Sequence, residues 1–240
     1  MKTKIIFFIC MFSAFIAFGQ NPKSIEETTC TPPKFTGIKG TVPILLKEKF
    51  PTIENYLRNN VTYPAVAVKQ LQQGTEVMKF IVSTNGEVSN IEIVNSVSKE
   101  IDDEVTEALM TTNGMWKPGN NNGNPVAMEK EISLVFRLED SRYSFNDLGK
   151  KYYANGAGML FINQSPKKAL KYFNKGIVLF PNDRSLLALR GIALFEIGDK
   201  NGALHDWNRV KNLGGFEADG YSENLINMKG YAEMNRVLGQ

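Results

Sequence analysis

The sequence predicts two domains of different class, an α+β domain of residues 50–139 and an all-α domain of residues 143–240. Apolar residues alternate with polar ones in the first part, as in strands, and recur at three- and four-residue spacing in the second, as in helices. Charge changes as well: residues 20–139 hold 12 basic and 15 acidic side chains, and residues 140–240 hold 14 and 10. With 240 residues, 42% hydrophobic and 22% charged, the composition is that of a globular protein.

The first 19 residues have the pattern of a secretory signal peptide. Two lysines precede the apolar run of residues 5–18, which ends at the small-x-small site Ala17-Phe18-Gly19. We expect cleavage near Gln20, residues 20–49 as an N-terminal extension, and a periplasmic protein without a membrane span. The alternative is an uncleaved membrane anchor, although 14 apolar residues fall short of the roughly 20 that a spanning helix needs.

Cleavage of this signal would leave a single cysteine and little net charge. Two lysines would be removed, so the net charge would fall from +3 to +1, which gives no support to nucleic-acid binding. Cys10 would be removed too, which excludes an internal disulfide. Cys30 is then either an incidental loop residue or a thiol that pairs with another molecule.

Hydrophobic periodicity and turn residues predict the elements of the first domain. Asn85-Gly86 supplies the turn of a β-hairpin, because its glycine tolerates positive φ. Ser98 is placed to cap a helix whose apolar residues fall on one face. The order is strand, strand, helix, strand, preceded by two short helices, with Pro64 in the first turn of the second. The expected strands are residues 76–82, 88–94 and 128–138, and the expected helices are residues 52–59, 65–72 and 99–112.

Short motifs in residues 50–138 resemble the TonB C-terminal domain. The motifs are Tyr63-Pro64, Gly74, Met78-x-Phe80-x-Val82 with Asn85-Gly86, Ile101-Asp102, Trp116-x-Pro118, Asn122-Gly123-x-Pro125 and Val135-Phe136-x-Leu138. They occur in the family's order and at similar spacing, and Pro33-Lys34-Phe35-Thr36-Gly37 resembles a segment that precedes this domain in many relatives. The resemblance implies a ββαβ domain with a three-stranded antiparallel sheet and a non-catalytic protein-binding role.

The resemblance also implies where a partner would bind. In such domains the last strand is a sheet edge that receives an extended segment of an outer-membrane receptor. The candidates are Met128, Glu129, Lys130, Glu131, Ser133, Val135 and Arg137 on this edge, and Asn60, Tyr63 and Pro64 in a region that contacts receptors in the family. Two alternatives stay open: the edge charges could merely prevent aggregation, and Tyr63 could be a core anchor. We expect Trp116 in the core.

These features predict an adaptor in TonB-dependent outer-membrane transport that binds extended segments by β-strand addition. Energy transducers of the family carry an uncleaved anchor and a long proline-rich spacer. Because neither is visible in this sequence, we expect an adaptor rather than a transducer.

The second domain holds two copies of a 34-residue pattern that resembles tetratricopeptide repeats. Tyr153, Ala157, Leu160, Ala169, Phe173, Gly176 and Pro181 are followed 34 positions later by Leu187, Gly191, Leu194, Ala203, Trp207, Val210 and Gly215. The expected repeats are residues 150–183 and 184–217, with a capping helix at residues 222–238. The implied groove would include Asn155, Met159, Asn163 and Arg190. The alternative function is therefore a repeat scaffold for envelope protein assembly, with the α+β domain structural.

The remaining chemistry does not favour catalysis. We expect His205 on a helix surface, and Asp102-Asp103-Glu104 in the first turn of a helix, where acidic groups stabilise the helix dipole. Residues 114–123 are glycine-rich but lack the Lys-Ser/Thr of a phosphate loop and precede a strand, so we expect a hairpin-like connection. No cluster has metal-ligand spacing. We expect no enzyme activity, no cofactor, no metal and no small-molecule substrate, and we expect proteins as partners.

Overall fold

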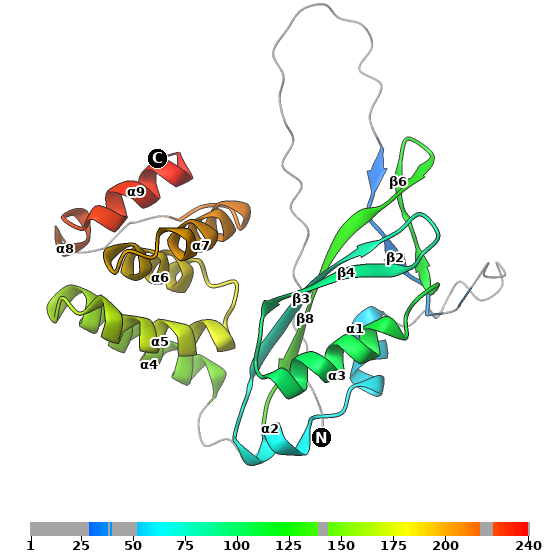
Figure 1. Cartoon of the computed structure of the whole chain (residues 1–240), viewed down its shortest axis with the longest axis horizontal. Helices are drawn as coiled ribbons and strands as arrows, with labels where there is room; N and C mark the ends of the chain where they lie inside the picture. Colours follow the sequence, from blue (N-terminus) through cyan, green and yellow to red (C-terminus); the bar gives the residue numbers. More distant parts are fainter. Residues whose placement is uncertain (1–28, 38, 40–51, 139–143, 217–222, 240) are drawn as a thin grey trace, which may run out of the picture. The chain divides into compact units, whose positions relative to one another are not determined.

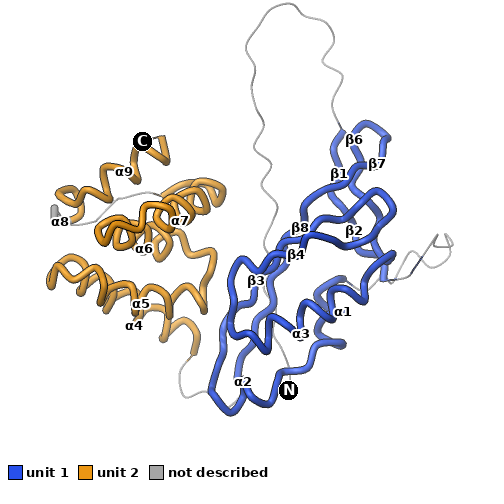
Figure 2. Tube along the Cα trace, viewed as in Figure 1, with its two compact units in different colours: residues 1–139 blue, residues 140–240 orange. Residues whose placement is uncertain are grey.

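A computed structural model describes residues 29–37, 39, 52–138, 144–216 and 223–239. The predicted signal peptide, Cys10 and much of the N-terminal extension lie outside the described residues. The chain divides into two compact units, residues 1–139 and 140–240 (Figure 2), and each is described by itself.

The main sheet of the first unit has three antiparallel strands in the order β4–β3–β8 (Figure 1). The central strand β3 (Gly74–Val82) pairs with β4 (Val88–Asn95) across the predicted hairpin. It pairs on its other side with β8 (Met128–Phe136) over nine consecutive residue pairs without a register shift. The three strands follow one another along the chain in the predicted order, with α3 (Lys99–Met110) before the last, and β8 ends two residues earlier than expected.

The described residues of this unit form three helices, α1 (Ile53–Asn60), α2 (Ala65–Lys69) and α3 (Lys99–Met110). The Thr52 side chain caps α1 and the Ser98 side chain caps α3, each by accepting a backbone N–H three residues on. Pro64 is the N-cap residue of α2, one position before the first turn where it was expected.

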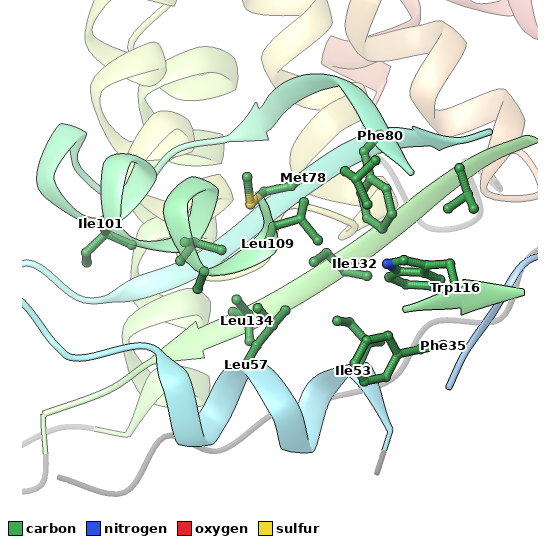
Figure 3. Close-up of a cluster of buried hydrophobic side chains, with 14 of the residues drawn as sticks. Phe35, Ile53, Leu57, Met78, Phe80, Ile101, Leu109, Trp116, Ile132 and Leu134 are labelled. Carbon is green, nitrogen blue, oxygen red and sulfur yellow. The ribbon is translucent and has the colours of Figure 1, made fainter. Parts of the chain in front are cut away.

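The core of the first unit lies between the sheet and the helices (Figure 3). Alternate residues of β3 and β8 face it because side chains alternate across a strand. Burying each large apolar side chain contributes roughly 1.5–3 kcal/mol. The labelled members are Phe35, Ile53, Leu57, Met78, Phe80, Ile101, Leu109, Trp116, Ile132 and Leu134.

Five short strands were not predicted. The region expected to be a hairpin-like connection holds β5 (Trp116–Lys117), β6 (Gly119–Asn121) and β7 (Asn124–Val126), and β6 and β7 pair as a hairpin. β1 (Cys30–Thr31) pairs with β6, and β2 (Lys34–Phe35) pairs with β5. Runs of two or three residues are too short to show a period, so sequence could not reveal them. Cys30 therefore lies in a short strand, exposed and without a disulfide, rather than in a loop.

An aromatic cluster holds the upstream strand β2 on the domain. The Phe35 ring lies edge-on to Trp116 and to Tyr56, with centroids 5.2 and 5.3 Å apart. Trp116 is buried as expected, contacts Phe80 edge-on, and donates its indole N–H to the Thr112 hydroxyl at 2.9 Å. Edge-to-face pairs add about 0.5–1.5 kcal/mol beyond buried area, which explains why a two-residue strand is held.

The second unit is helical. Consecutive helices pack side by side, and α9 packs against both α6 and α7. Within the described residues, none of the helices combines the length and apolar composition that crossing a membrane requires. The elements are α4 (Phe145–Ala157), a π-helical continuation η2 (Gly158–Ile162), α5 (Pro166–Leu179), α6 (Arg184–Glu196), α7 (Lys200–Asn212), α8 (Glu223–Ile226) and α9 (Lys229–Leu238).

Two glycines let the helices of this unit approach. A Cβ on Gly156 would lie 2.4 Å from the Phe173 ring, and a Cβ on Gly191 would lie 2.3 Å from the Trp207 ring. Ala157, the neighbour of Gly156 in the 34-residue pattern, also packs against the core of the unit. Gly156 and Gly191 are 35 positions apart in the sequence, whereas the rings that they contact, Phe173 and Trp207, are 34 positions apart.

The β3–β4 turn depends on Gly86, and Gly86→Ala should destabilise the first unit by about 2–4 kcal/mol. Gly86 has φ +82°, and an added Cβ would lie 2.3 Å from the Trp116 carbonyl oxygen, which is backbone and cannot rotate away. Gly123→Ala is the matched control, because Gly123 has φ +86° but open space around it. The control should cost only about 1 kcal/mol. Hydrogen exchange of the β3 amides would measure both, and equal losses would contradict the steric argument.

A candidate protein-binding edge

The last strand, β8, is an edge of the main sheet. One side pairs along the whole strand with β3, and no strand in the described part of the chain pairs with the other side. An edge strand presents backbone N–H and C=O groups that can hydrogen-bond to an added strand. The candidate residues of β8 therefore all lie on a strand with one unpaired side in the described structure.

The two faces of β8 differ in chemistry. On the helix side, Ile132, Leu134 and Phe136 are buried in the core, and the half-buried Lys130 lies opposite Phe80 of β3. Glu129, Glu131, Ser133 and Val135 lie on the opposite face. There the Lys79 ammonium pairs with the Glu129 carboxylate at 3.2 Å and stands opposite Glu131 in register. Met128 is the first residue of the strand, and Arg137 follows its end, exposed.

Tyr63 is a core anchor. Its hydroxyl donates to the Gln72 carbonyl oxygen, and its ring meets Phe136 edge-on at 5.3 Å. Burial raises the pKa of Tyr63 to about 12. Because Phe136 is the last residue of β8, the Tyr63 region and the edge strand meet at one end of the sheet. Asn60 donates to the Tyr56 carbonyl oxygen at 2.8 Å.

A buried carboxyl group at this sheet escaped the sequence analysis. Glu76 is 0% exposed and lies on β3 opposite Leu134 of β8. Its Oε2 accepts the Val97 N–H at 2.9 Å, and its Oε1 has no hydrogen-bond partner among the described protein atoms. The neighbouring acid is Asp102 of α3, which accepts the Ser96 hydroxyl. The sequence did contain an indication of this burial. Glu76 is two residues before Met78 on the same strand, so both side chains point to the core face.

Burial raises the pKa of Glu76 to about 9. The hydrogen bond from the Val97 N–H acts in the opposite direction and lowers the pKa. The negative charge of Asp102 and its side-chain interaction with Glu76 raise the pKa further. A pKa of about 9 means that the neutral, protonated carboxyl group is the favoured form of Glu76 at neutral pH.

The acidic run at α3 is tied to its neighbours. Asp103 pairs with Lys99 at 2.7 Å, and Glu104 accepts the Thr62 N–H at 2.7 Å. Asp102 is in the first turn, as expected, whereas Asp103 and Glu104 lie beyond it, because the helix begins at Lys99. Among the residues with described positions, no three His, Cys, Asp or Glu side chains are grouped as a metal site would need.

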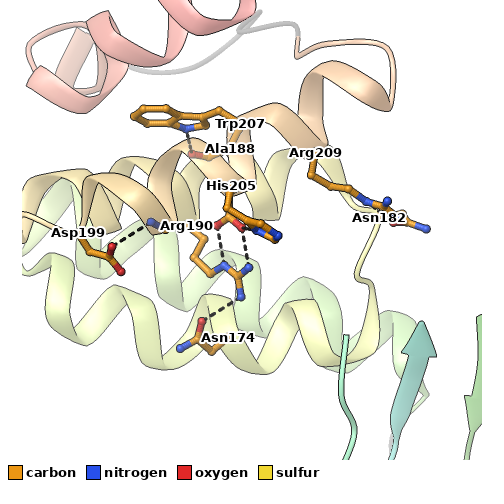
Figure 4. Close-up of polar contacts among 10 residues, drawn as sticks. Asn174, Asn182, Ala188, Arg190, Asp199, His205, Trp207 and Arg209 are labelled. Atoms are coloured by element: carbon orange, nitrogen blue, oxygen red, sulfur yellow. Dashed lines mark hydrogen bonds and ion pairs between the residues drawn. The ribbon is translucent and has the colours of Figure 1, made fainter. Parts of the chain in front are cut away.

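In the second unit, the residues assigned to a groove do not share one role. Asn155 and Met159 are half-buried and Asn163 is exposed. Arg190 is held inside the unit: its Nε and Nη2 donate to Asp206 at 2.7 Å each, and its Nη1 donates to Asn174 at 3.3 Å (Figure 4). It therefore links α6 to α7 and α5. His205 is exposed on α7, 3.6 Å from Asp206.

An open pocket of about 400 Å³ lies within the second unit, between α4 and the start of α6. Apolar side chains (Tyr153, Phe180 and Leu186) and polar or charged ones (Asn146, Lys150, Asp183 and Ser185) both line it. The lining residues are Asn146, Gly149, Lys150, Tyr153, Phe180, Asp183, Ser185 and Leu186. None of the predicted groove residues lines it.

Comparison with known proteins concerns the first unit. Residues 59–138, a third of the chain, match the family model of the Gram-negative bacterial TonB protein C-terminal. Among solved structures, the chain is similar to the NMR solution structure of the Helicobacter pylori TonB C-terminal domain: 19% identity, covering 37% of this chain and 92% of that chain, with a TM-score of 0.29. No curated protein matches the chain. The family match supports a TonB C-terminal domain, a type of non-catalytic module for protein interaction in the cell envelope.

Glu76→Gln should remove a pH dependence of stability. The pKa of Glu76 is higher in the folded chain than the ordinary value of 4.5, so its contribution is complete below pH 4.5 and is lost as pH rises through about 9. Glutamine keeps an acceptor for Val97 and a donor for Asp102 but does not titrate. Urea unfolding between pH 5 and 9 should show a falling stability for the wild type and a flatter profile for the variant. Parallel profiles would show that Glu76 does not bind this proton.

Arg190→Ala should destabilise the helical unit by about 2–3 kcal/mol, because it leaves the Asp206 carboxylate, 1% exposed, without its cation. The matched control is Arg236→Ala, which removes an arginine from an exposed pair with Glu233 and should leave stability nearly unchanged. Urea unfolding followed by far-UV circular dichroism measures both. A small loss for both variants would mean that the Arg190–Asp206 pair contributes nothing to stability.

Proposed function

We propose that the first unit is an adaptor module in TonB-dependent outer-membrane transport, and that it binds an extended partner segment by β-strand addition to β8. The observation that carries this proposal is the position of β8 as the last strand of its sheet in the described residues. The TonB C-terminal match over residues 59–138 supports it. The predicted signal peptide, if cleaved, would place the module in the periplasm.

The main sheet has two outer strands, and β8 is the better template. Its pairing with β3 runs through nine residues in one register. The pairing of β4 is interrupted by two register shifts, and Asn90 within β4 has φ +49°. Irregular edges disfavour addition of another strand, whereas a regular edge presents evenly repeated donors and acceptors.

Side chains along β8 would set the preference among segments. A strand added at this edge would place alternate side chains beside Glu129 and Glu131 on one face and beside Lys130 on the other. The end of β8 adjoins Tyr63, so the bound segment would end near the Tyr63-Pro64 region. Backbone bonds would provide affinity, and these side chains would provide selectivity.

The alternative, a scaffold function of a repeat-like helical unit, has its own support in the pocket between α4 and α6. A pocket lined by Tyr153, Phe180 and Leu186 together with a few polar groups suits an apolar anchor of a partner protein. In this function the first unit would be structural, and the pocket rather than β8 would receive the partner.

Two proline variants of β8 test strand addition. Successive N–H groups of a strand point to opposite sides, so Lys130→Pro and Ser133→Pro each remove a donor from a different side. One variant loses a bond to β3 and should unfold at lower temperature. The other should keep its unfolding temperature and lose partner binding. Ser133→Ala is the control, which keeps the N–H and should bind as the wild type does.

The binding measurement is an amide chemical-shift titration of the full chain with peptides from the N-terminal segments of outer-membrane receptors. Shifts confined to β8 and the Tyr63 region are expected. Absence of shifts, with β8 amides already protected from exchange, would reject strand addition. Shifts confined to the pocket residues would instead favour the scaffold function.

A further inference from the structure

Helix α5 carries a basic face that neither proposed function uses. Four lysines at three- and four-residue spacing lie on one side of α5, and all are exposed. The opposite side, with Phe173 and Ile177, is buried in the unit. The helix contains no acidic residue, and eight residues of helix span about 12 Å. The four lysines are Lys167, Lys168, Lys171 and Lys175.

The protein does little to neutralise this face. Among the described residues, no carboxylate forms an ion pair with any of the four lysines. Lys175 instead lies 5.9 Å from the centre of the Tyr152 ring. At the start of α5 the Ser165 side chain makes no capping bond and the first turn has no acidic residue. Lys167 and Lys168 therefore stand at the positive end of the helix dipole, where a cation is unfavourable. An anionic partner would relieve this repulsion.

An exposed apolar side chain lies shortly before the basic face in the sequence. Ile162 is 81% exposed, the highest value among the exposed large apolar residues of the described chain. It ends η2, and η2 packs against α5, whose first lysine follows five positions later. An apolar tip beside a row of lysines matches a lipid surface. The isoleucine can enter the acyl boundary while the ammonium groups stay among the headgroups.

The type of cation also favours a lipid surface over an acidic protein. The planar guanidinium group of arginine binds a carboxylate through two parallel hydrogen bonds. Protein surfaces that recognise carboxylates in a fixed geometry therefore often use arginine. All four cations of this face are lysines, which are point charges suited to a diffuse negative surface.

We propose that the α5 basic face (Lys167, Lys168, Lys171 and Lys175), together with Ile162 at the end of η2, binds a membrane surface that carries anionic phospholipid headgroups. The interaction is peripheral and reversible, and it weakens with ionic strength because exposed charges are screened. It does not depend on strand addition at β8.

Co-sedimentation of the full chain with lipid vesicles tests this proposal. Vesicles of equal parts phosphatidylglycerol and phosphatidylcholine should bind the protein, and vesicles of phosphatidylcholine alone should bind it far less. Lys171→Gln with Lys175→Gln should weaken binding to the anionic vesicles about 25-fold, since each lysine near such a surface contributes about fivefold. Ile162→Ser should weaken it several-fold as well. Circular dichroism would verify that the exposed substitutions leave the fold intact.

The matched control is Lys69→Gln with Lys229→Gln, two exposed lysines outside this face. It changes the net charge equally and should leave binding nearly unchanged. An equal loss in the control would reduce the effect to net charge and overturn the proposal. Equal binding to both kinds of vesicle would assign binding to apolar segments elsewhere, and overturn it too. If the protein bound no vesicles but bound polyglutamate, and the α5 variants lost that binding, the proposal would be overturned. The partner of the basic face would then be an acidic protein.

Discussion

The pairing of β3 with β8 is the interaction on which the first unit depends. β3 is the central strand, and the side chains of Met78, Phe80 and Val82 are almost fully buried. Nine pairs in one register fix which residues of β8 face the core and which face away, because a slip of one residue would exchange the two faces. The same pairing leaves β8 as an outer strand, so the core and the candidate binding edge arise from a single constraint.

The β3–β8 register also determines the environment of Glu76. The register places a carboxyl group in a core position of β3, next to Asp102 at the start of α3. A charged carboxylate there would lack compensation, so the site holds a proton instead. Glu76 accepts the Val97 N–H and lies beside Asp102 of the covering helix, near the end of the sheet where Tyr63 meets Phe136. A polar link of this kind is satisfied only in one arrangement of strand and helix.

The helical unit is organised by close approach. Glycines at two positions allow the rings of Phe173 and Trp207 to lie against neighbouring helices, and Arg190 joins three helices through Asp206 and Asn174. Phe173, Trp207 and Arg190 are therefore held by contacts inside the unit. Two of its surfaces differ in chemistry: the pocket between α4 and α6 is lined by apolar and polar side chains, and the outer face of α5 carries four lysines.

The sequence by itself determined the elements whose period is long enough to read. The two long strands of the hairpin, the third strand, α3 with its Ser98 cap and the helical character of the second half all follow from patterns within ten to fifteen residues. Only the tertiary structure decided the rest. The pairing of Cys30 and Phe35 with residues near 116–121 joins segments more than 80 positions apart, and local patterns carry no record of such contacts. The commitment of Arg190 to Asp206, the protonation of Glu76 and the core role of Tyr63 likewise depend on neighbours that the fold brings together, because burial and partner geometry, and not residue type, set what a polar side chain does.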